Sequence, residues 1–264
     1  MGYYVGLDSG STMCKAVLFD DKNSTLVDCQ SAKTGWNPKQ SAAECLESLL
    51  ERNSLHVEDA AVSATGYGRE AIDFAGHIFT EITCHAFGAL FLLPGIGGVI
   101  DIGGQDSKVI HIKDNRVVDF LMNDKCAAGT GRFLSMACDT LGISLDEIDT
   151  FAHPDDAIVI NSMCTVFAES EIIGSLAMQK DRAKILTGVL QSIAQKIRQM
   201  AGKFDFDENK PLLMTGGLSR SNVLVKAISQ AIGFEVAAHT HANFAGAIGA
   251  CICAANKNRA AESP

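Results

Sequence analysis

The order of apolar and polar residues along the chain contains one repeat. Residues 5–19 read VGLDSGSTMCKAVLF, and residues 98–111 read GVIDIGGQDSKVIH. In both stretches an apolar run ends in Asp, a glycine turn follows, and a second apolar run begins after the turn. Alignment of the two copies pairs three residues: Asp8 with Asp101, Gly10 with Gly103, and Lys15 with Lys108. With the strand-like runs TLVDCQ and RVVDFLM that come next, the pattern predicts two β-meanders.

Helical spacing of apolar residues marks the segments that follow each meander. Residues 41–52 and 182–204 both show this spacing. A third glycine turn, LLMTGGLSRSN at residues 212–222, lies between a short apolar run and a helix expected from near Asn222. We expect the last apolar helix, residues 244–256, to pack against the first meander.

This order of strands and helices predicts an α/β fold of two domains whose mixed sheets face each other across a cleft. The first domain is expected to comprise residues 1–94 plus 245–264, and the second residues 95–244. A length of 264 residues and a hydrophobic content of 47% are sufficient for packed cores.

Charge and cysteine content narrow the class of protein. A formal charge of −9 without a run of Lys or Arg argues against nucleic acid and anionic membranes as partners. Pro94 and several glycines interrupt the longest apolar stretch, residues 86–100, so we expect no membrane-spanning helix. Nine cysteines at irregular spacing do not form the pattern of a disulfide framework. This cysteine pattern indicates a reducing, cytoplasmic compartment. Since a strand is expected already at Tyr3, we expect no signal peptide.

The first glycine turn has the composition of a phosphate-binding loop. Consecutive N–H groups at a tight turn form a nest for phosphate oxygens, Ser11 and Thr12 add hydroxyl donors, and Lys15 adds positive charge. Asp8 is anionic, so its expected role is to hold a water molecule bound to Mg²⁺. The second turn offers the matching groups Asp101, Gly103, Gly104 and Gln105.

The third turn would serve a different part of the same ligand. Gly216 and Gly217 would let the backbone approach a base and a sugar closely. The chain has neither a G-x-x-x-x-G-K-[ST] run nor a properly placed G-x-G-x-x-G, so the P-loop and Rossmann interpretations do not fit. One such turn alone would more simply be an ordinary hairpin, because Asp and Gly are common in turns. Two matched turns and a third favour a nucleotide.

The three segments GLDSGSTMCK, VIDIGGQDSK and LLMTGG resemble the phosphate-1, phosphate-2 and adenosine motifs of the superfamily of acetate kinase, sugar kinases, heat-shock chaperones and actin. The resemblance implies two ribonuclease H-like domains of the actin/sugar-kinase type with an interdomain nucleotide cleft. Four further segments narrow it: ATGYGR, TEITCHA, NDKCAAGTGRF and CTVFAESEI. Together they resemble the ATP-dependent activators of 2-hydroxyacyl-CoA dehydratases and benzoyl-CoA reductases.

In those activators one 4Fe–4S cluster bridges two identical subunits, so the resemblance implies a homodimer with Cys126 and Cys164 as the cluster ligands. A cubane needs four thiolates, and a two-fold axis through the cluster would double the two from each chain. Both cysteines precede expected helices, and we expect Cys126 at a helix start, where unpaired N–H groups favour an anion. The remaining cysteines are expected to be buried thiols: Cys14, Cys29, Cys45, Cys84, Cys138, Cys251 and Cys253.

The predicted function is ATP hydrolysis coupled to transfer of a low-potential electron from ferredoxin or flavodoxin to a partner such as a 2-hydroxyacyl-CoA dehydratase. One alternative is a small-molecule kinase of the same superfamily that uses Asp101, and another is an ATP-switched interaction module without catalysis. A third is the activator of a double-cubane or benzoyl-CoA type reductase. Cys126 and Cys164 favour an activator, because a kinase or a switch has no use for them.

The predicted site residues form three groups. Those expected to be catalytic are Asp8, Asp101 and Gln105. Those expected to bind the nucleotide are Gly10, Ser11, Thr12, Met13, Cys14, Lys15, Gly103, Gly104, Asp106, Gly216, Gly217 and Asn243. Those expected to bind the cluster are Cys126 and Cys164. ATP, Mg²⁺ and one 4Fe–4S cluster per homodimer are the expected cofactors.

Overall fold

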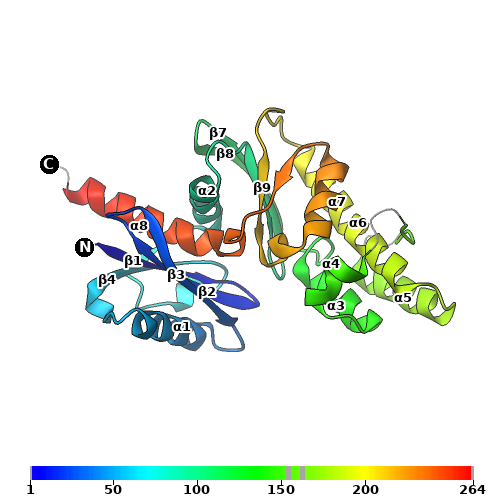
Figure 1. The fold of residues 1–264 in the computed structure, drawn as a ribbon, viewed down its shortest axis with the longest axis horizontal. Helices are drawn as coiled ribbons and strands as arrows, with labels where there is room; N and C mark the ends of the chain where they lie inside the picture. Colours follow the sequence, from blue (N-terminus) through cyan, green and yellow to red (C-terminus); the bar gives the residue numbers. More distant parts are fainter. Residues whose placement is uncertain (1, 153–155, 161–163, 263–264) are drawn as a thin grey trace. The chain divides into compact units, whose positions relative to one another are not determined.

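The computed structural model describes residues 2–152, 156–160 and 164–262, and the chain divides into two compact units (Figure 1). The first unit comprises residues 1–95, 114–117 and 241–264. The second unit comprises residues 96–113 and 118–240. In the described ranges no helix is long and apolar enough to cross a membrane.

A mixed five-stranded sheet, ordered β3-β2-β1-β4-β5, forms the centre of the first unit. Its strands are β1 (Tyr3–Ser9), β2 (Met13–Asp20), β3 (Thr25–Lys33), β4 (Ala60–Thr65) and β5 (His77–Ile78). β2 is antiparallel to both β1 and β3, which confirms the first predicted meander. β4 runs parallel to β1 on its other side, so that the carboxyl ends of β1 and β4 lie together.

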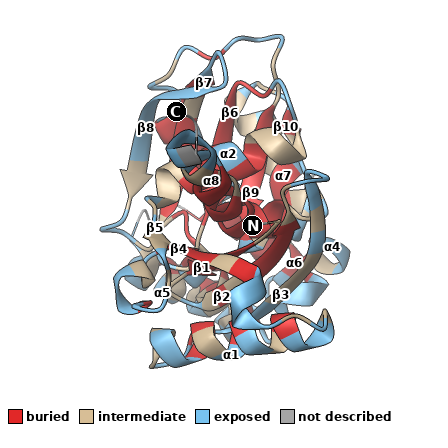
Figure 2. Cartoon of the chain, turned by 90° about the vertical axis from the view of Figure 1, so that its left-hand side faces the viewer, coloured by how far each residue is buried: buried red, intermediate tan, exposed pale blue. Residues whose placement is uncertain are grey.

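Helices cover both faces of this sheet because apolar side chains alternate along its strands. Val5 and Leu7 share a buried cluster with α1 (Pro38–Arg52), whereas Tyr4 belongs to a cluster with α8 (Ala245–Glu262). In Figure 2 the outer face of α1 is pale blue, and much of α8 is red. A Cβ at Gly6 would lie 1.9 Å from the Ala247 carbonyl oxygen, so this glycine lets α8 lie directly on the sheet.

The helix boundaries differ from the sequence prediction at several ends. α1 begins at Pro38, earlier than expected, because the Asn37 side chain accepts a hydrogen bond from the Gln40 N–H and Pro suits the first helical turn. The final helix begins at Ala245 and continues to Glu262, and its packing on the first sheet is confirmed. α2 (Glu81–Leu92) packs beside α8, and the short helical turns of this unit are η1 (Val57–Asp59), η2 (Arg69–Ala71) and η5 (Ala242–Phe244).

The second unit repeats this sheet, with the order β10-β9-β6-β7-β8. Its strands are β6 (Gly98–Ile102), β7 (Ser107–Lys113), β8 (Arg116–Asn123), β9 (Leu212–Gly216) and β10 (Val236–Ala237). β6 and β7 are antiparallel with β8 beside them, which confirms the second meander. β9 is parallel to β6, just as β4 is parallel to β1.

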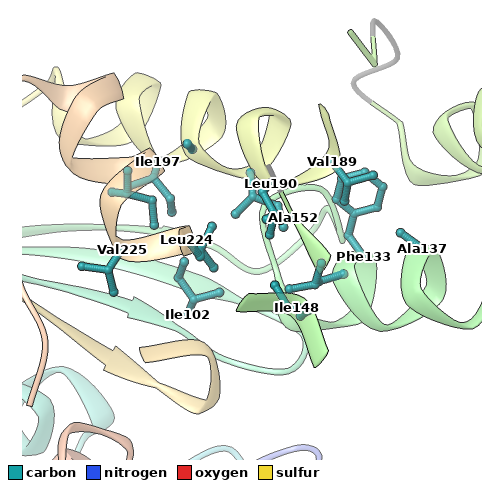
Figure 3. Close-up of a cluster of buried hydrophobic side chains, with 14 of the residues drawn as sticks. Ile102, Phe133, Ala137, Ile148, Ala152, Val189, Leu190, Ile197, Leu224 and Val225 are labelled. Atoms are coloured by element: carbon teal, nitrogen blue, oxygen red, sulfur yellow. The ribbon is translucent and has the colours of Figure 1, made fainter. Parts of the chain in front are cut away.

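The core of the second unit joins β6 to a group of helices, as Figure 3 shows for Ile102, Phe133, Leu190 and Leu224. The helices are α3 (Gly131–Leu141), α4 (Ile148–Phe151), α5 (Thr165–Ala177), α6 (Arg182–Ala201) and α7 (Asn222–Ile232), with short turns η3 (Leu145–Glu147) and η4 (Gly217–Arg220). α6 ends at Ala201, earlier than expected, with Gly202 as its C-cap. α7 begins at Asn222 as predicted.

Candidate functional site

In the first unit, Asp8 lies in a row of side chains across three strands at the carboxyl end of β1. The strand register places Lys15 of β2 on one side of it and Thr65 of β4 on the other. We call Asp8, Lys15 and Thr65 the Asp8 row. Asp8 is only 3% exposed, and its Oδ2 is 3.6 Å from Lys15 Nζ. That separation exceeds a good hydrogen bond, so the lysine is not tightly held by the carboxylate.

Two buried polar atoms without a hydrogen-bond partner belong to this row or to its neighbouring residue. Among the described residues three buried side-chain atoms lack a hydrogen-bond partner: Ser9 Oγ, Thr65 Oγ1 and Asn243 Oδ1. Ser9 ends β1 and Thr65 ends β4, the two strands whose carboxyl ends lie together. Buried polar groups are nearly always hydrogen-bonded, so these atoms are available to a bound ligand. A buried carboxylate, a nearby ammonium and free hydroxyls form a donor set that fits phosphate with Mg²⁺.

Two glycines bring the backbone against the Asp8 carboxylate. Gly66 has φ +94°, and a Cβ there would lie 2.6 Å from Asp8 Oδ1. A Cβ at Gly246, in the first turn of α8, would lie 2.7 Å from Asp8 Oδ2 and 3.0 Å from Nε2 of the buried His85. Side chains at either position would therefore displace the carboxylate.

The second unit contains a matching row around Asp101. The register places Lys108 of β7 and Thr215 of β9 on either side of it, and we call these three residues the Asp101 row. Here the contacts are short: Thr215 Oγ1 donates to Asp101 Oδ1 at 2.9 Å, and Lys108 Nζ donates to Asp101 Oδ2 at 3.2 Å. Gly216 follows with φ +86°, and a Cβ there would lie 2.9 Å from Asp101 Oδ1.

The turns beside the two rows have the same backbone geometry. Gly10 donates its N–H to the Met13 carbonyl at 3.1 Å, and Gly103 donates to the Asp106 carbonyl at 3.0 Å. Their side chains differ, because Asp106 Oδ2 forms a 2.8 Å ion pair with Lys108. A Cβ at Gly103 would meet Asp106 Oδ1, so a side chain here would displace the Asp106 carboxylate from Lys108.

The remaining predicted nucleotide residues lie in or near these turns, except Asn243, which lies in η5 before α8. Ser11 and Thr12 lie in the turn between β1 and β2, Gly104 and Gln105 in the turn between β6 and β7, and Gly217 at the end of β9. A Cβ on Gly217 would have no atom within 4 Å, so space is open there. The Cys14 side chain instead faces the core under α1, and only its backbone could contact a ligand.

The turn between β6 and β7 is hydrogen-bonded to the start of α3. Gly131 and Arg132, the first residues of α3, donate their N–H groups to the carbonyl oxygens of Gly103 and Gly104 at 2.9 and 2.8 Å. These N–H groups would otherwise lack a helical partner. A displacement of the turn therefore acts directly on α3.

Cys126 and Cys164 differ from the other cysteines in exposure. Both are exposed, and six of the others are buried as expected. The expectation that Cys29 is buried is wrong: it is half-buried, because it lies on β3 at the edge of the first sheet. Burial raises the pKa of the Cys138 thiol to about 11, and a hydrogen bond with Cys253, together with burial, raises the pKa of Cys84 well above its usual value. Since the thiolate is the metal ligand, Cys84 and Cys138 are poor iron ligands. Hydrogen bonds with Cys14 and Cys84 instead lower the pKa of the Cys45 and Cys253 thiols, and burial is what distinguishes these two from Cys126 and Cys164.

The prediction that Cys126 lies at a helix start is wrong. α3 has Thr130 as its N-cap, and Cys126 lies in the preceding loop, where Asn123 Nδ2 donates to the carbonyl oxygens of Cys126 and Ala128 at 2.9 Å. The loop continues for one further turn because Thr130 Oγ1 bonds the Ala127 carbonyl. Cys164, by contrast, is the N-cap of α5.

A model of the BadF/BadG/BcrA/BcrD ATPase family matches residues 5–254. The chain belongs to this ATPase family. The uncharacterized protein YjiL of Escherichia coli is 41% identical over 253 residues, which are 96% of each chain. The (R)-2-hydroxyglutaryl-CoA dehydratase activating ATPase of Acidaminococcus fermentans is 36% identical over 260 residues, 97% of this chain and 98% of the relative.

A solved structure agrees over the same length. The activator of the 2-hydroxyisocaproyl-CoA dehydratase from Clostridium difficile, with bound ADPNP, has a TM-score of 0.92 and 33% identity, and covers 98% of this chain and 97% of its own. The predicted resemblance and the predicted fold of two ribonuclease H-like domains are confirmed.

Thr65 and Gly66 lie beside Asp8, but they are not among the site residues predicted from the sequence. The segment ATGYGR ends β4 as LMTGG ends β9, so Thr65 and Gly66 correspond to Thr215 and Gly216. The shared Thr-Gly pair after an apolar run was the available signal. His85 lies in the segment TEITCHA, whose sequence alone does not show that its Nε2 and Asp8 Oδ2 both lie beside Gly246.

Proposed function

We propose that the protein is an ATP-hydrolysing iron–sulfur activator that passes a low-potential electron to an enzyme of the 2-hydroxyacyl-CoA dehydratase type. The observation that carries the proposal is that the two exposed cysteines belong to the unit that contains a nucleotide-type turn bonded to α3. The names of the similar activators from Acidaminococcus fermentans and Clostridium difficile support the choice of partner.

In this proposal the two hairpin turns bind the phosphates of ATP through backbone N–H groups. Lys15 adds positive charge and Asp8 holds a water molecule of Mg²⁺, which itself neutralises phosphate charge. Asp101 and Gln105 orient the attacking water, and the β9 turn and Asn243 contact the nucleoside. The unpartnered atoms around the Asp8 row support this assignment.

Cys126 and Cys164 would bind one 4Fe–4S cluster together with the same two residues of a second chain. The cluster supplies one-electron chemistry, with ferredoxin or flavodoxin as the donor. Among the residues described, no group of three or more His, Cys, Asp and Glu side chains could hold a metal ion, so one chain cannot supply the four thiolates of a cubane. A two-fold axis supplies the missing pair.

Hydrolysis would act on the cluster through α3. Loss of the γ-phosphate changes the contacts of the β6–β7 turn, and its carbonyl oxygens bond the first N–H groups of α3, directly after the Cys126 loop. The reducing cytoplasm is the proposed location, because nine free thiols and a cluster near the surface would be oxidised elsewhere.

The test of the cluster assignment is iron content after purification without oxygen. We expect about four irons per dimer, and their loss in Cys126→Ser and in Cys164→Ser, since symmetry removes two ligands each time. Cys29→Ser, at a half-buried cysteine, is the matched control and should keep its iron. ATP binding should persist in all three variants. Full iron content in Cys164→Ser would contradict the bridging cluster.

The test of the coupling is Gly131→Ala. A Cβ there would lie 3.0 Å from the Gly103 carbonyl oxygen, so the turn and α3 must separate slightly. The backbone of residue 131 has no positive φ, so alanine suits its conformation. We expect ATPase activity to persist while the electron paramagnetic resonance signal of the reduced cluster loses its response to ATP. An unchanged response would remove this connection from the mechanism.

A further inference from the structure

Lys108 is a buried cation for which the proposed reaction has no direct use. Its side chain is 2% exposed, and it is among the largest fully buried side chains of the described residues. Its Nζ lies 2.8 Å from Asp106 Oδ2 and 3.2 Å from Asp101 Oδ2. Burial of an ammonium group is costly unless it is paired, so both carboxylates are needed to keep it there.

The corresponding lysine of the first unit, Lys15, has only one carboxylate beside it among the described residues. Met13 occupies the place in the β1–β2 turn that Asp106 occupies in the β6–β7 turn, as the matching N–H contacts of Gly10 and Gly103 show. Lys15 therefore meets one carboxylate, at 3.6 Å, and its side chain is 13% exposed. One exchange in the turn separates a lysine that can reach a ligand from one that cannot.

We propose that Lys108 is a positioning residue for ATP hydrolysis: paired with Asp106, it holds the Asp101 carboxylate against Thr215 and does not itself contact the nucleotide. The inference rests on the proposed binding of ATP phosphates at this turn. Asp106 correspondingly acts on Lys108 instead of on the ligand, and the turn binds phosphate with its backbone N–H groups.

Loss of Lys108 would leave two carboxylates without a counter-ion. Both oxygens lie within about 3 Å of the present Nζ, so the two carboxylates are near neighbours in a largely buried place. Like charges so placed repel each other and repel the phosphates of ATP. Removal of the Asp106 charge should relieve much of that repulsion.

The experiment compares Lys108→Met, Asp106→Asn and the double variant in the full-length protein purified without oxygen. We expect the Lys108→Met variant to raise the KM for ATP by about tenfold or more. In the double variant the KM for ATP should fall again, to within about threefold of the KM of Asp106→Asn alone. Thermal unfolding of each variant is measured beside the kinetics.

Two outcomes would overturn the inference. A double variant as defective as Lys108→Met would mean that the lysine contacts the phosphates directly. An unchanged KM and kcat per folded molecule in Lys108→Met, with only a lower Tm, would mean a purely structural role. A wild-type protein that neither binds nor hydrolyses ATP would instead contradict the proposed function.

If Lys108→Met does not fold, the same kind of lysine–carboxylate pair is built in the first turn instead. Met13→Asp places a carboxylate where Asp106 lies in the second turn, so Lys15 is drawn away from the ligand, and the KM for ATP should rise by about tenfold. Met13→Asn, without the charge, is the matched control and should change the KM far less. Equal KM values in the two variants would overturn the inference.

Discussion

The Asp8 and Asp101 rows use the same residue types in the same strand register, yet their contacts differ. In the Asp101 row the hydroxyl and the ammonium are both hydrogen-bonded to the carboxylate, at 2.9 and 3.2 Å. In the Asp8 row the ammonium is 3.6 Å away, and the Thr65 hydroxyl is not hydrogen-bonded to the carboxylate. The closed row forms its interactions within the protein, whereas the open row keeps its donors for a ligand.

The comparison shows how a structural repeat can take on two roles through few substitutions. Both rows keep the tight turn and the Thr-Gly pair at the end of the parallel strand. The charge at the turn differs, because Asp106 replaces the apolar Met13. The variants below separate the roles by measuring stability and ligand binding on matched residues.

The largest expected difference is between the two lysines. Lys108→Met should lower the free energy of unfolding by about 3–5 kcal/mol, because it leaves buried carboxylates unpaired. Lys15→Met should cost less than that, since its ion pair is long and its loss leaves one buried carboxylate, Asp8, without a counter-ion instead of two. Urea unfolding at pH 7 measures both values. ATP affinity should respond differently from stability. Lys15→Met should weaken ATP binding strongly for its stability cost, because it removes a direct contact with phosphate.

Equal stability losses in the two lysine variants would mean that the Asp8 row is as closed as the Asp101 row. The distinction between an open and a closed row would then fail.

The next difference concerns the glycines after the parallel strands. Gly66→Ala and Gly216→Ala should each cost about 1–3 kcal/mol, because alanine is strained at positive φ. The added Cβ would also meet Asp8 Oδ1 at 2.6 Å or Asp101 Oδ1 at 2.9 Å. Gly217→Ala is the control for stability, since its Cβ meets no atom within 4 Å. Thermal unfolding provides the ranking, and a Gly217→Ala loss as large as the others would contradict it.

The smallest expected effects concern the threonines. Thr215→Val removes the hydrogen bond to Asp101 and should cost about 1–2 kcal/mol. Thr65→Val removes a hydroxyl whose neighbour is the weakly bonding Cys84 thiol, so the unliganded protein should change by less than about 0.5 kcal/mol or become more stable. Calorimetric unfolding with and without ADP tests this: ADP should stabilise Thr65→Val less than the wild type. A Thr65→Val loss equal to that of Thr215→Val would show that Thr65 is already bonded.

Local pattern was sufficient for much of the fold. The two meanders, the helix from Asn222 and the helix that packs on the first sheet follow from apolar spacing, because strand and helix periods appear within a few residues of sequence. Helix ends were less well predicted, since capping by Asn37 and the loop after Cys126 depend on single contacts.

A repeat of residue type and spacing is enough to show that Asp8 and Asp101 end matching strands before glycine turns. That Thr65 lies beside Asp8 depends on which distant strand pairs in parallel with β1, so it follows from the folded structure alone. The folded structure also decided which lysine is buried and which cysteines are exposed. Burial depends on how segments far apart in the sequence pack together, although the carboxylates that compensate Lys108, Asp101 and Asp106, lie close to it in the sequence.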